Sequence, residues 1–446
     1  MVRERRLMKV LNKSVNYFGI LVLMIGVFWL APSYASQPLP EEDGLIHLGV
    51  ASCASSVCHG KTTRQKSTNV LQNEYTTWTQ HDRHARAYKT LLSKESKKMA
   101  KLLGIGAAHE AKVCLDCHSD NVDDGLRGRR FQRSDGIGCE ACHGGAEKWI
   151  KTHTEPSATH ASNIASGLYP TESPAARAEL CASCHVGNEK KWATHDIMGA
   201  GHPRLSFELD TFTVIQPAHY QVDADYTKRK ADYSGLKIWL AGQVMVADHW
   251  LSLIESNRFT GDGLFPEISF YDCHACHHGM SDERKQSGLV SHPGDLRLND
   301  AYFQIIEIII AVVAPQDKAS WKSNAEAFIQ AGHRDKKLLM QLSQTLRGTL
   351  KTLKPKIENG LSVSQQSDLL RKLLLLGSEN RFLDYTSCEQ IVMSISVIVD
   401  ALDLNRSLGR EIDGLYDSLS NEDAFKAKRY KKALSTFKSA FERLNR

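Results

Sequence analysis

The sequence predicts a mainly α-helical protein in two parts, a segment with little regular sheet at residues 36–295 and a helical domain or bundle at residues 296–446. The first segment has few long apolar runs and weak strand signals, with short polar and glycine-containing stretches between them. The second segment repeats apolar residues at helical spacing. A chain of 446 residues has room for two or three packed units, and both segments have ordinary domain lengths.

The first 35 residues are expected to be a secretory signal peptide. Basic residues come first, an uncharged apolar run follows from Tyr17 to Leu30, and small residues precede a cleavage point after Ala35. An uncleaved anchor is the alternative, but the run is shorter than the roughly 20 residues that span a bilayer. We therefore expect export to the periplasm and no membrane span in the mature chain. Cleavage would remove five basic residues and one acidic residue, so the formal charge of +5 would fall to about +1. Such a small charge argues against nucleic-acid binding.

Capping residues and apolar stripes locate the main helices. In the first segment helices should begin near Thr76, Ser93 and Ser234, because these residue types cap helix N-termini. In the second segment an apolar run from Leu369 to Leu376 is ended by Gly377. Two further stripes have helical spacing: Ile391, Ile395, Ile398 and Leu402, and then Leu434, Phe437, Phe441 and Leu444. Such stripes usually pack into a core, and a docking surface or a homo-oligomer formed through these helices is the alternative.

Four segments have the pattern C-x-x-C-H: Cys114–His118, Cys139–His143, Cys181–His185 and Cys273–His277. This pattern attaches c-type haem. Two thiols three residues apart reach the two vinyl groups of one haem, and the next residue offers an imidazole to the iron. A zinc site or a redox pair also uses C-x-x-C, but neither needs a histidine after every second cysteine. The first segment is therefore predicted to be a multihaem cytochrome c domain, whose haems supply the apolar core that the segment lacks.

Cys53, Cys58 and His59 form a fifth and wider motif, with four residues between the cysteines. A disulfide or a single-thioether attachment is the alternative. The remaining cysteine, Cys388, precedes an apolar helical run and is expected to be a buried small hydrophobe. About five covalent haem c groups are thus expected. The expected attachment cysteines are Cys53, Cys58, Cys114, Cys117, Cys139, Cys142, Cys181, Cys184, Cys273 and Cys276, and the expected proximal ligands are His59, His118, His143, His185 and His277.

The histidine content exceeds what these motifs need. Only five of the 19 histidines end a motif, so enough remain to give every iron a second histidine ligand. Closed bis-histidine coordination favours electron transfer over substrate binding. A haem enzyme that acts on a small nitrogen or sulfur compound at one open iron is the alternative, so the sequence leaves catalysis undecided.

The stretch TWTQHDRHARAY from Thr77, followed by CLDCH and GIGCEACHGG, resembles the cytochrome c-554 family, which is related to hydroxylamine oxidoreductase. The resemblance covers roughly residues 45 to 205. It implies that His84 is the distal ligand of the iron held by His143, and that His153 pairs with His59. The nearby His81 and His160 are alternatives for these two roles. The family's type member has four haems, whereas this chain adds a fifth motif and a long C-terminal extension.

The distal ligands of the other haems are less defined. In that type member the second haem is five-coordinate, and for His118 the candidates here are His109, Lys112 or no protein ligand. His195 and His202 follow the fourth motif around a glycine-containing turn, and both are expected to be distal ligands. For the fifth haem His249 is favoured. The alternatives are His219, His278 and His292.

The expected partners are redox proteins, namely a quinol dehydrogenase or other cytochromes. Five haems would add about ten propionate charges to a mature chain near neutrality. The holoprotein should then be acidic overall. We therefore expect a partner with a basic docking face, and association that weakens as salt rises.

Overall fold

The chain divides into two compact units, Met1–Pro38 and Leu39–Arg446, and the second is described below. The computed structural model describes residues 37–66, 70–260, 266–273, 277, 296–332, 334–379 and 383–444. The expected signal peptide at residues 1–35, with its cleavage point, lies outside these residues, as do Cys276, His278 and His292. Both expected domains fall within the second unit, and the boundary at residue 295 stays a prediction.

The described residues form helices connected by loops, which confirms the mainly α fold class. Within these ranges the only β pairing is two isolated bridges, His47 with Arg127 and Tyr271 with Leu298. No helix among the described residues is long and apolar enough to cross a membrane.

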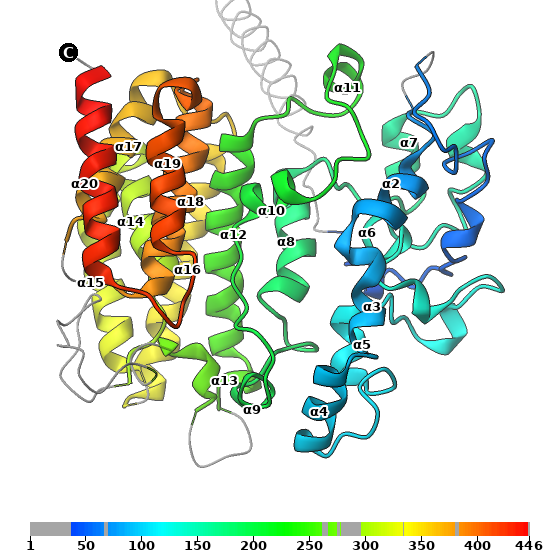
Figure 1. Ribbon diagram of the computed structural model, residues 1–446, viewed down its shortest axis with the longest axis horizontal. Coiled ribbons are helices and arrows are strands. Elements are labelled where there is room, and N and C mark those ends of the chain that lie inside the picture. The colour runs from blue at the N-terminus through cyan, green and yellow to red at the C-terminus, as the bar shows by residue number, and fades with distance from the viewer. Residues whose placement is uncertain are drawn as a thin grey trace, which may run out of the picture. The chain divides into compact units, whose positions relative to one another are not determined.

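The first segment consists mostly of short helices and 3₁₀ turns, with one long helix, α12, near its end (Figure 1). They are η1 Pro40–Glu42, η2 Val50–Ser52, α2 Glu74–His81, η3 Arg83–Arg86, α3 Ala87–Thr90, α4 Lys94–Leu103, α5 Lys112–His118, η4 Asp124–Leu126, η5 Arg133–Asp135, α6 Glu140–His143, η6 Thr152–Thr154, α7 His160–Ala165, α8 Pro174–His185, α9 His195–Gly199, α10 Leu209–Ile215, α11 Ala224–Arg229, α12 Gly235–Glu255, α13 Asn257–Thr260 and η7 Ile268–Phe270.

Three of these helices end on the histidine of a cysteine motif, namely α5, α6 and α8. Five of the six cysteines of these three motifs therefore lie within helices, and Cys139 is the N-cap of α6. Ser93 and Ser234 cap α4 and α12 through their side chains, as the capping rule predicts. The helix expected near Thr76 begins two residues earlier, at Glu74.

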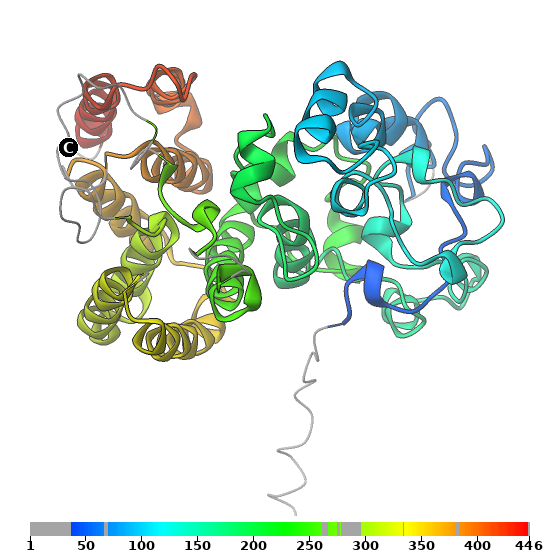
Figure 2. The same cartoon turned by 90° about the horizontal axis from the view of Figure 1, so that it is seen from below.

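The second segment is a set of longer helices that lie side by side (Figures 1 and 2). They are α14 Ala301–Val313, η9 Pro315–Asp317, α15 Lys318–Ala331, α16 Lys336–Ile357, α17 Val363–Leu376, α18 Tyr385–Ala401, α19 Asn405–Ser418 and α20 Ala427–Leu444. The long helix α12 packs against α14, α16 and α18 on one side and against α8 on the other. It thus joins the bundle to the motif-bearing segment.

The apolar core is divided unevenly between the segments. One large cluster runs from α12 to α20 and buries most of the predicted stripe residues, including Ile391, Ile398 and Phe437. Cys388 is fully buried in it, as expected for a small hydrophobe. Around the second motif the cluster is small, with Leu91, Ala100, Ala108 and Leu115 at its centre. Apart from α12, the motif-bearing segment therefore has only small apolar clusters of its own.

Candidate haem-binding sites

Five pairs of histidine rings face each other at nearly equal separation. Each pair contains one motif histidine and one histidine from elsewhere. The centroid distances are 6.3 Å for His59 and His153 (site 1), 6.3 Å for His118 and His202 (site 2), 6.1 Å for His143 and His219 (site 3), 6.1 Å for His185 and His84 (site 4), and 6.3 Å for His277 and His195 (site 5).

This separation is the one that a single metal ion between two imidazoles requires. With metal–nitrogen bonds of about 2 Å on opposite sides of the ion, the ring centroids lie about 6.3 Å apart. Two histidines are too few for a structural zinc ion, which takes four ligands. Among the described residues no group of three or more histidine, cysteine or acidic side chains could hold a metal. A porphyrin that supplies the other four ligands fits the pairs.

Hydrogen bonds at Nδ1 orient several of these rings. In five of the rings Nδ1 lies 2.8–3.1 Å from an oxygen: Glu74 Oε2 for His59, Asp82 Oδ1 for His84, the Ala87 carbonyl for His118, the Trp149 carbonyl for His153 and the Pro203 carbonyl for His202. Bonding of Nδ1 fixes the tautomer and leaves Nε2 as the nitrogen that can bind a metal. These rings therefore have the hydrogen bonds that commonly hold metal-binding histidines in place.

Burial lowers the pKa of three motif histidines, His118, His143 and His185, and so favours the neutral form that metal ligation requires, whereas the hydrogen bond to Glu74 raises the pKa of His59. Burial lowers the pKa of His143 to about 3 and that of His185 to about 4. The pKa of Asp82, the residue that orients His84, is lowered to about 2. Burial raises this pKa, but hydrogen bonds from His84 and Gln216 outweigh burial. Asp82 is thus a permanent carboxylate that holds the His84 ring.

The cysteine motifs lie next to one another in a fixed order. The thiols of Cys53 and Cys139 are close enough to shift each other's pKa, which brings sites 1 and 3 together. The thiols of Cys117 and Cys184 shift each other's pKa in the same way, which joins sites 2 and 4. Cys142 interacts electrostatically with Cys181, so sites 3 and 4 also adjoin. The described cysteines are all free thiols and none is in a disulfide.

Sites 2 and 4 share one apolar cavity of about 540 Å³. Its walls contain both cysteines and the motif histidine of each site, together with the facing His84 and His202. This volume lies in the range of about 300–1,000 Å³ that is usual for cofactor pockets. The cavity therefore combines thiols, imidazoles and apolar walls, the groups that a covalently bound haem would need.

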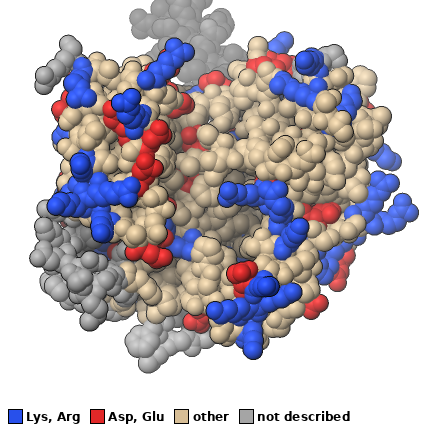
Figure 3. Space-filling view, viewed as in Figure 1, with Lys and Arg blue, Asp and Glu red and all other residues tan. Residues whose placement is uncertain are grey.

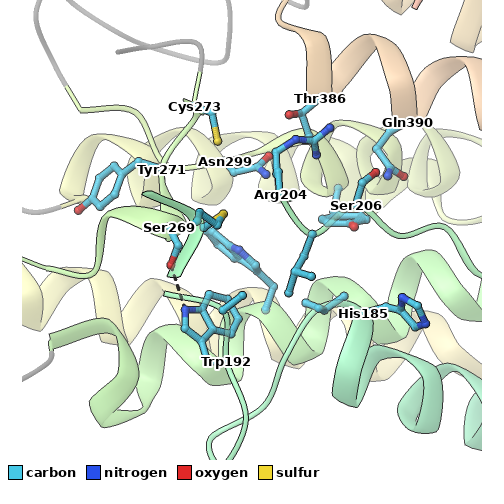
Figure 4. Close-up of a pocket in the computed structure, with 16 residues that line it drawn as sticks. His185, Trp192, Arg204, Ser206, Ser269, Tyr271, Cys273, Asn299, Thr386 and Gln390 are labelled. Carbon is cyan, nitrogen blue, oxygen red and sulfur yellow. Dashed lines mark hydrogen bonds between the residues drawn. The ribbon is translucent and has the colours of Figure 1, made fainter. Parts of the chain in front are cut away.

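Site 5 adjoins site 4 through a smaller cavity of about 60 Å³ that both Cys273 and His185 line (Figure 4). Trp192 forms part of this wall and donates a hydrogen bond of 2.9 Å to the Ser269 hydroxyl. Cys276 lies outside the described residues, so Cys273 and His277 represent the motif here.

The structure arranges two expected distal histidines differently. His84 faces His185 and not His143, because its ring is held by Asp82, which Gln216 bonds in turn. His143 instead faces His219, a lone histidine in the loop after α10 that sequence reasoning considered only for the fifth haem. His219 belongs to no recognisable motif, so the sequence alone could not pair it with His143.

His249 is placed away from the fifth motif. Its Nε2 is in close contact with the Gly187 carbonyl, because α12 packs against α8. The histidine that faces His277 is His195 and not His249. The backbone N–H of His195 donates a hydrogen bond of 2.8 Å to Glu267. His153 does lie opposite His59, and His202 lies opposite His118.

The other candidates have different surroundings. His109 faces the Tyr88 ring, and Lys112 is paired with Asp116 at 2.7 Å. His81 is exposed, and His160 Nε2 lies 2.7 Å from Glu172. None of these four side chains faces a motif histidine within the described ranges.

Comparison with known proteins agrees with this chemistry. The family model described as cytochrome c554 and c-prime matches residues 52–144, which contain the first three motifs. The resemblance inferred from the motifs is thereby confirmed over this stretch. No curated protein and no solved structure matches the chain.

Proposed function

Because residues 52–144 form a c-type cytochrome segment of the c554 and c-prime family, we propose that this protein transfers electrons through five covalently bound haem c groups with bis-histidine ligation. The observation that carries the proposal is the set of five histidine pairs at 6.1–6.3 Å. Haem held in this way supplies reversible one-electron chemistry.

The residues that would hold the haems are those of the five sites. Ten motif cysteines, from Cys53 to Cys276, would form the thioethers, and each facing pair of histidines would supply the axial ligands. Two histidines per site leave no coordination position for a substrate. This favours electron transfer over the alternative, a haem enzyme with one open iron.

The contacts between motifs set the order of the sites. Site 1 adjoins site 3, site 3 adjoins site 4, and site 4 also adjoins sites 2 and 5. Site 4 would therefore be a branch point, and sites 1, 2 and 5 would be the ends where partners exchange electrons. We further propose a periplasmic location after cleavage at Ala35, and a quinol dehydrogenase or another cytochrome as partner.

The test is a haem count by pyridine haemochrome, combined with reduced spectra in the presence and absence of carbon monoxide. We expect five haems per chain and no spectral shift with carbon monoxide. The His202→Ala variant should open site 2 and produce a shift in about one haem of five. The matched His249→Ala variant should produce none, because its Nε2 contacts a carbonyl. Fewer than five haems, or a shift in the unaltered protein, would overturn the proposal.

A further inference from the structure

Basic side chains gather around helix α4. Residues 83–101 contain seven lysines and arginines but one acidic residue. The four lysines on α4 are all exposed: Lys94, Lys97, Lys98 and Lys101. In Figure 3 basic side chains cluster over the position that α4 occupies in Figure 1. We refer to these four lysines as the α4 lysine patch.

The four lysines of this patch have no salt-bridge partner among the described residues. Within the described ranges no carboxylate lies within 4 Å of any of the four ammonium groups, although other lysines have such partners. Lys190 and Lys191, for example, pair with Glu42 and Glu41. Unpaired charges on one helix face produce a local positive potential that attracts acidic surfaces.

Exposed apolar side chains occur on α4 and directly before it in the chain. Leu102 on α4 is 63% exposed, and Leu92, two residues before the helix, is 43% exposed. Such a combination of apolar side chains and a charged rim is the composition of a protein interface. Binding of a simple polyanion would need the lysines but not the exposed apolar side chains.

The opposite face of α4 forms a wall of site 2. Met99, Ala100 and Leu103 line the 540 Å³ cavity together with Cys114 and His118. The patch is thus separated from site 2 by one helix thickness, about 10 Å with side chains. Site 2 is also one of the three ends in the proposed order of sites, so a partner on the patch would be close to an end of the route.

We propose that the α4 lysine patch is the docking surface for an acidic electron-carrier protein that exchanges electrons with site 2. The proposal rests on the proposed function, because it assumes that site 2 holds a haem. It differs from the expectation drawn from net charge, which favours a basic partner face. Salt screens exposed charges beyond about 10 Å, so a docked partner responds to the local patch and not to the distant propionates.

The test uses the full holoprotein and an acidic [2Fe–2S] ferredoxin as the probe donor. The variant carries Lys97→Glu, Lys98→Glu and Lys101→Glu. The control carries Lys428→Glu, Arg429→Glu and Lys432→Glu on α20, an equal charge change at exposed residues of a helix far from the motifs in sequence. A third protein with glutamine at the three α4 positions removes charge without reversal, in case the glutamates disturb the helix.

Ferredoxin-driven haem reduction is followed by stopped flow, and ferredoxin binding by calorimetry. We expect the rate constant of the unaltered protein to fall about tenfold between about 20 mM and 300 mM salt. At low salt the glutamate variant should be slower by about tenfold or more, the glutamine variant by several-fold, and the control by less than about twofold. The dissociation constants should follow the same order.

Three results separate the possibilities. Equal losses in variant and control would overturn the proposal in favour of a net-charge effect. Patch-dependent sedimentation with phosphatidylglycerol vesicles, with unchanged ferredoxin kinetics, would overturn it in favour of a membrane surface. Dithionite reduces haems without docking, so failure of dithionite to reduce five haems would refute the proposed function itself, whereas full reduction by dithionite leaves that function intact when the patch proposal fails.

Discussion

The protonation of Asp210 is predicted to make the stability of the protein depend on pH. Asp210 is buried near the start of α10, and its Oδ1 has no hydrogen-bond partner within the described residues. The pKa of Asp210 is raised from 3.8 to about 7, mainly by burial. The negative charges of Glu208 and Asp400 raise it further, and the positive charge of Arg177 lowers it in part. Between these two pKa values the folded state therefore holds a proton that the unfolded state has released.

The sign follows from this difference. Between the two pKa values the folded state binds more protons than the unfolded state, so the free energy of unfolding falls as pH rises. At high pH the full cost of the buried carboxylate is about 4 kcal/mol, and the part that develops between about pH 5 and pH 8 is about 2.5 kcal/mol. Asp210→Asn removes the titration, so its unfolding free energy should lack this decrease.

The assay is urea unfolding of the holoprotein and the variant across that pH range, with stability compared pair by pair. The partly exposed Asp225, paired with Arg229 on α11, offers the control Asp225→Asn, which should follow the unaltered protein. Equal pH slopes for the Asp210→Asn variant and the unaltered protein would refute the reasoning. The effect also bears on function, because α10 leads to Gln216, the residue that holds Asp82 beneath His84.

Two further predictions concern the sites. Asp82→Asn should loosen the His84 ring and weaken its binding to the iron of site 4 by about 10- to 100-fold, because a carboxylate that bonds a ligand histidine sets the orientation of that ring. The change should be seen as partial carbon monoxide binding. Full resistance to carbon monoxide would contradict this. Gly144→Ala should destabilise the protein by about 1–3 kcal/mol in urea, since Gly144 has φ +81° and a Cβ there would lie 2.7 Å from the Gly167 carbonyl oxygen. The control, Gly348→Ala at an exposed helical position, should instead stabilise the protein by about 0.5–1 kcal/mol. If Gly144→Ala is as stable as the unaltered protein, the argument about Gly144 is wrong.

The sequence predicts local features well and distant pairings poorly. Ser93 and Ser234 were expected at helix starts and do cap helices, because capping depends on residues three positions apart. The cysteine motifs could likewise be recognised, because thiols and proximal histidine are neighbours in the chain.

The distal histidines depend on tertiary structure. His84 is directed to His185 by a carboxylate that is fixed by Gln216, 134 residues further on. His195 is held by Glu267, which is 72 residues away. No spacing rule connects these positions, so the sequence could offer candidates but could not choose among them.

The C-terminal helices have a role that their apolar stripes did not reveal. A polar face of α18 binds the chain just after His202: Glu389 accepts hydrogen bonds from Arg204 (3.0 Å) and Ser206 (2.6 Å), and Gln390 donates one to the Phe207 carbonyl (3.1 Å). Phe207 in turn stacks on the His185 ring at 5.6 Å. The bundle therefore positions residues of sites 2 and 4.

This role predicts the outcome of Glu389→Gln. The amide keeps the size of the side chain but loses the charge-assisted bond to Arg204, which should cost about 1.5–3 kcal/mol. Because Arg204 is two residues after His202, the same change should increase the fraction of site 2 that binds carbon monoxide, while the haem count stays the same. Glu442→Gln, at an exposed position of α20, is the matched control and should change neither quantity. If Glu389→Gln unfolds at the same urea concentration as the unaltered protein and excludes carbon monoxide equally well, then α18 does not hold the His202 segment, and the bundle contributes only its own core.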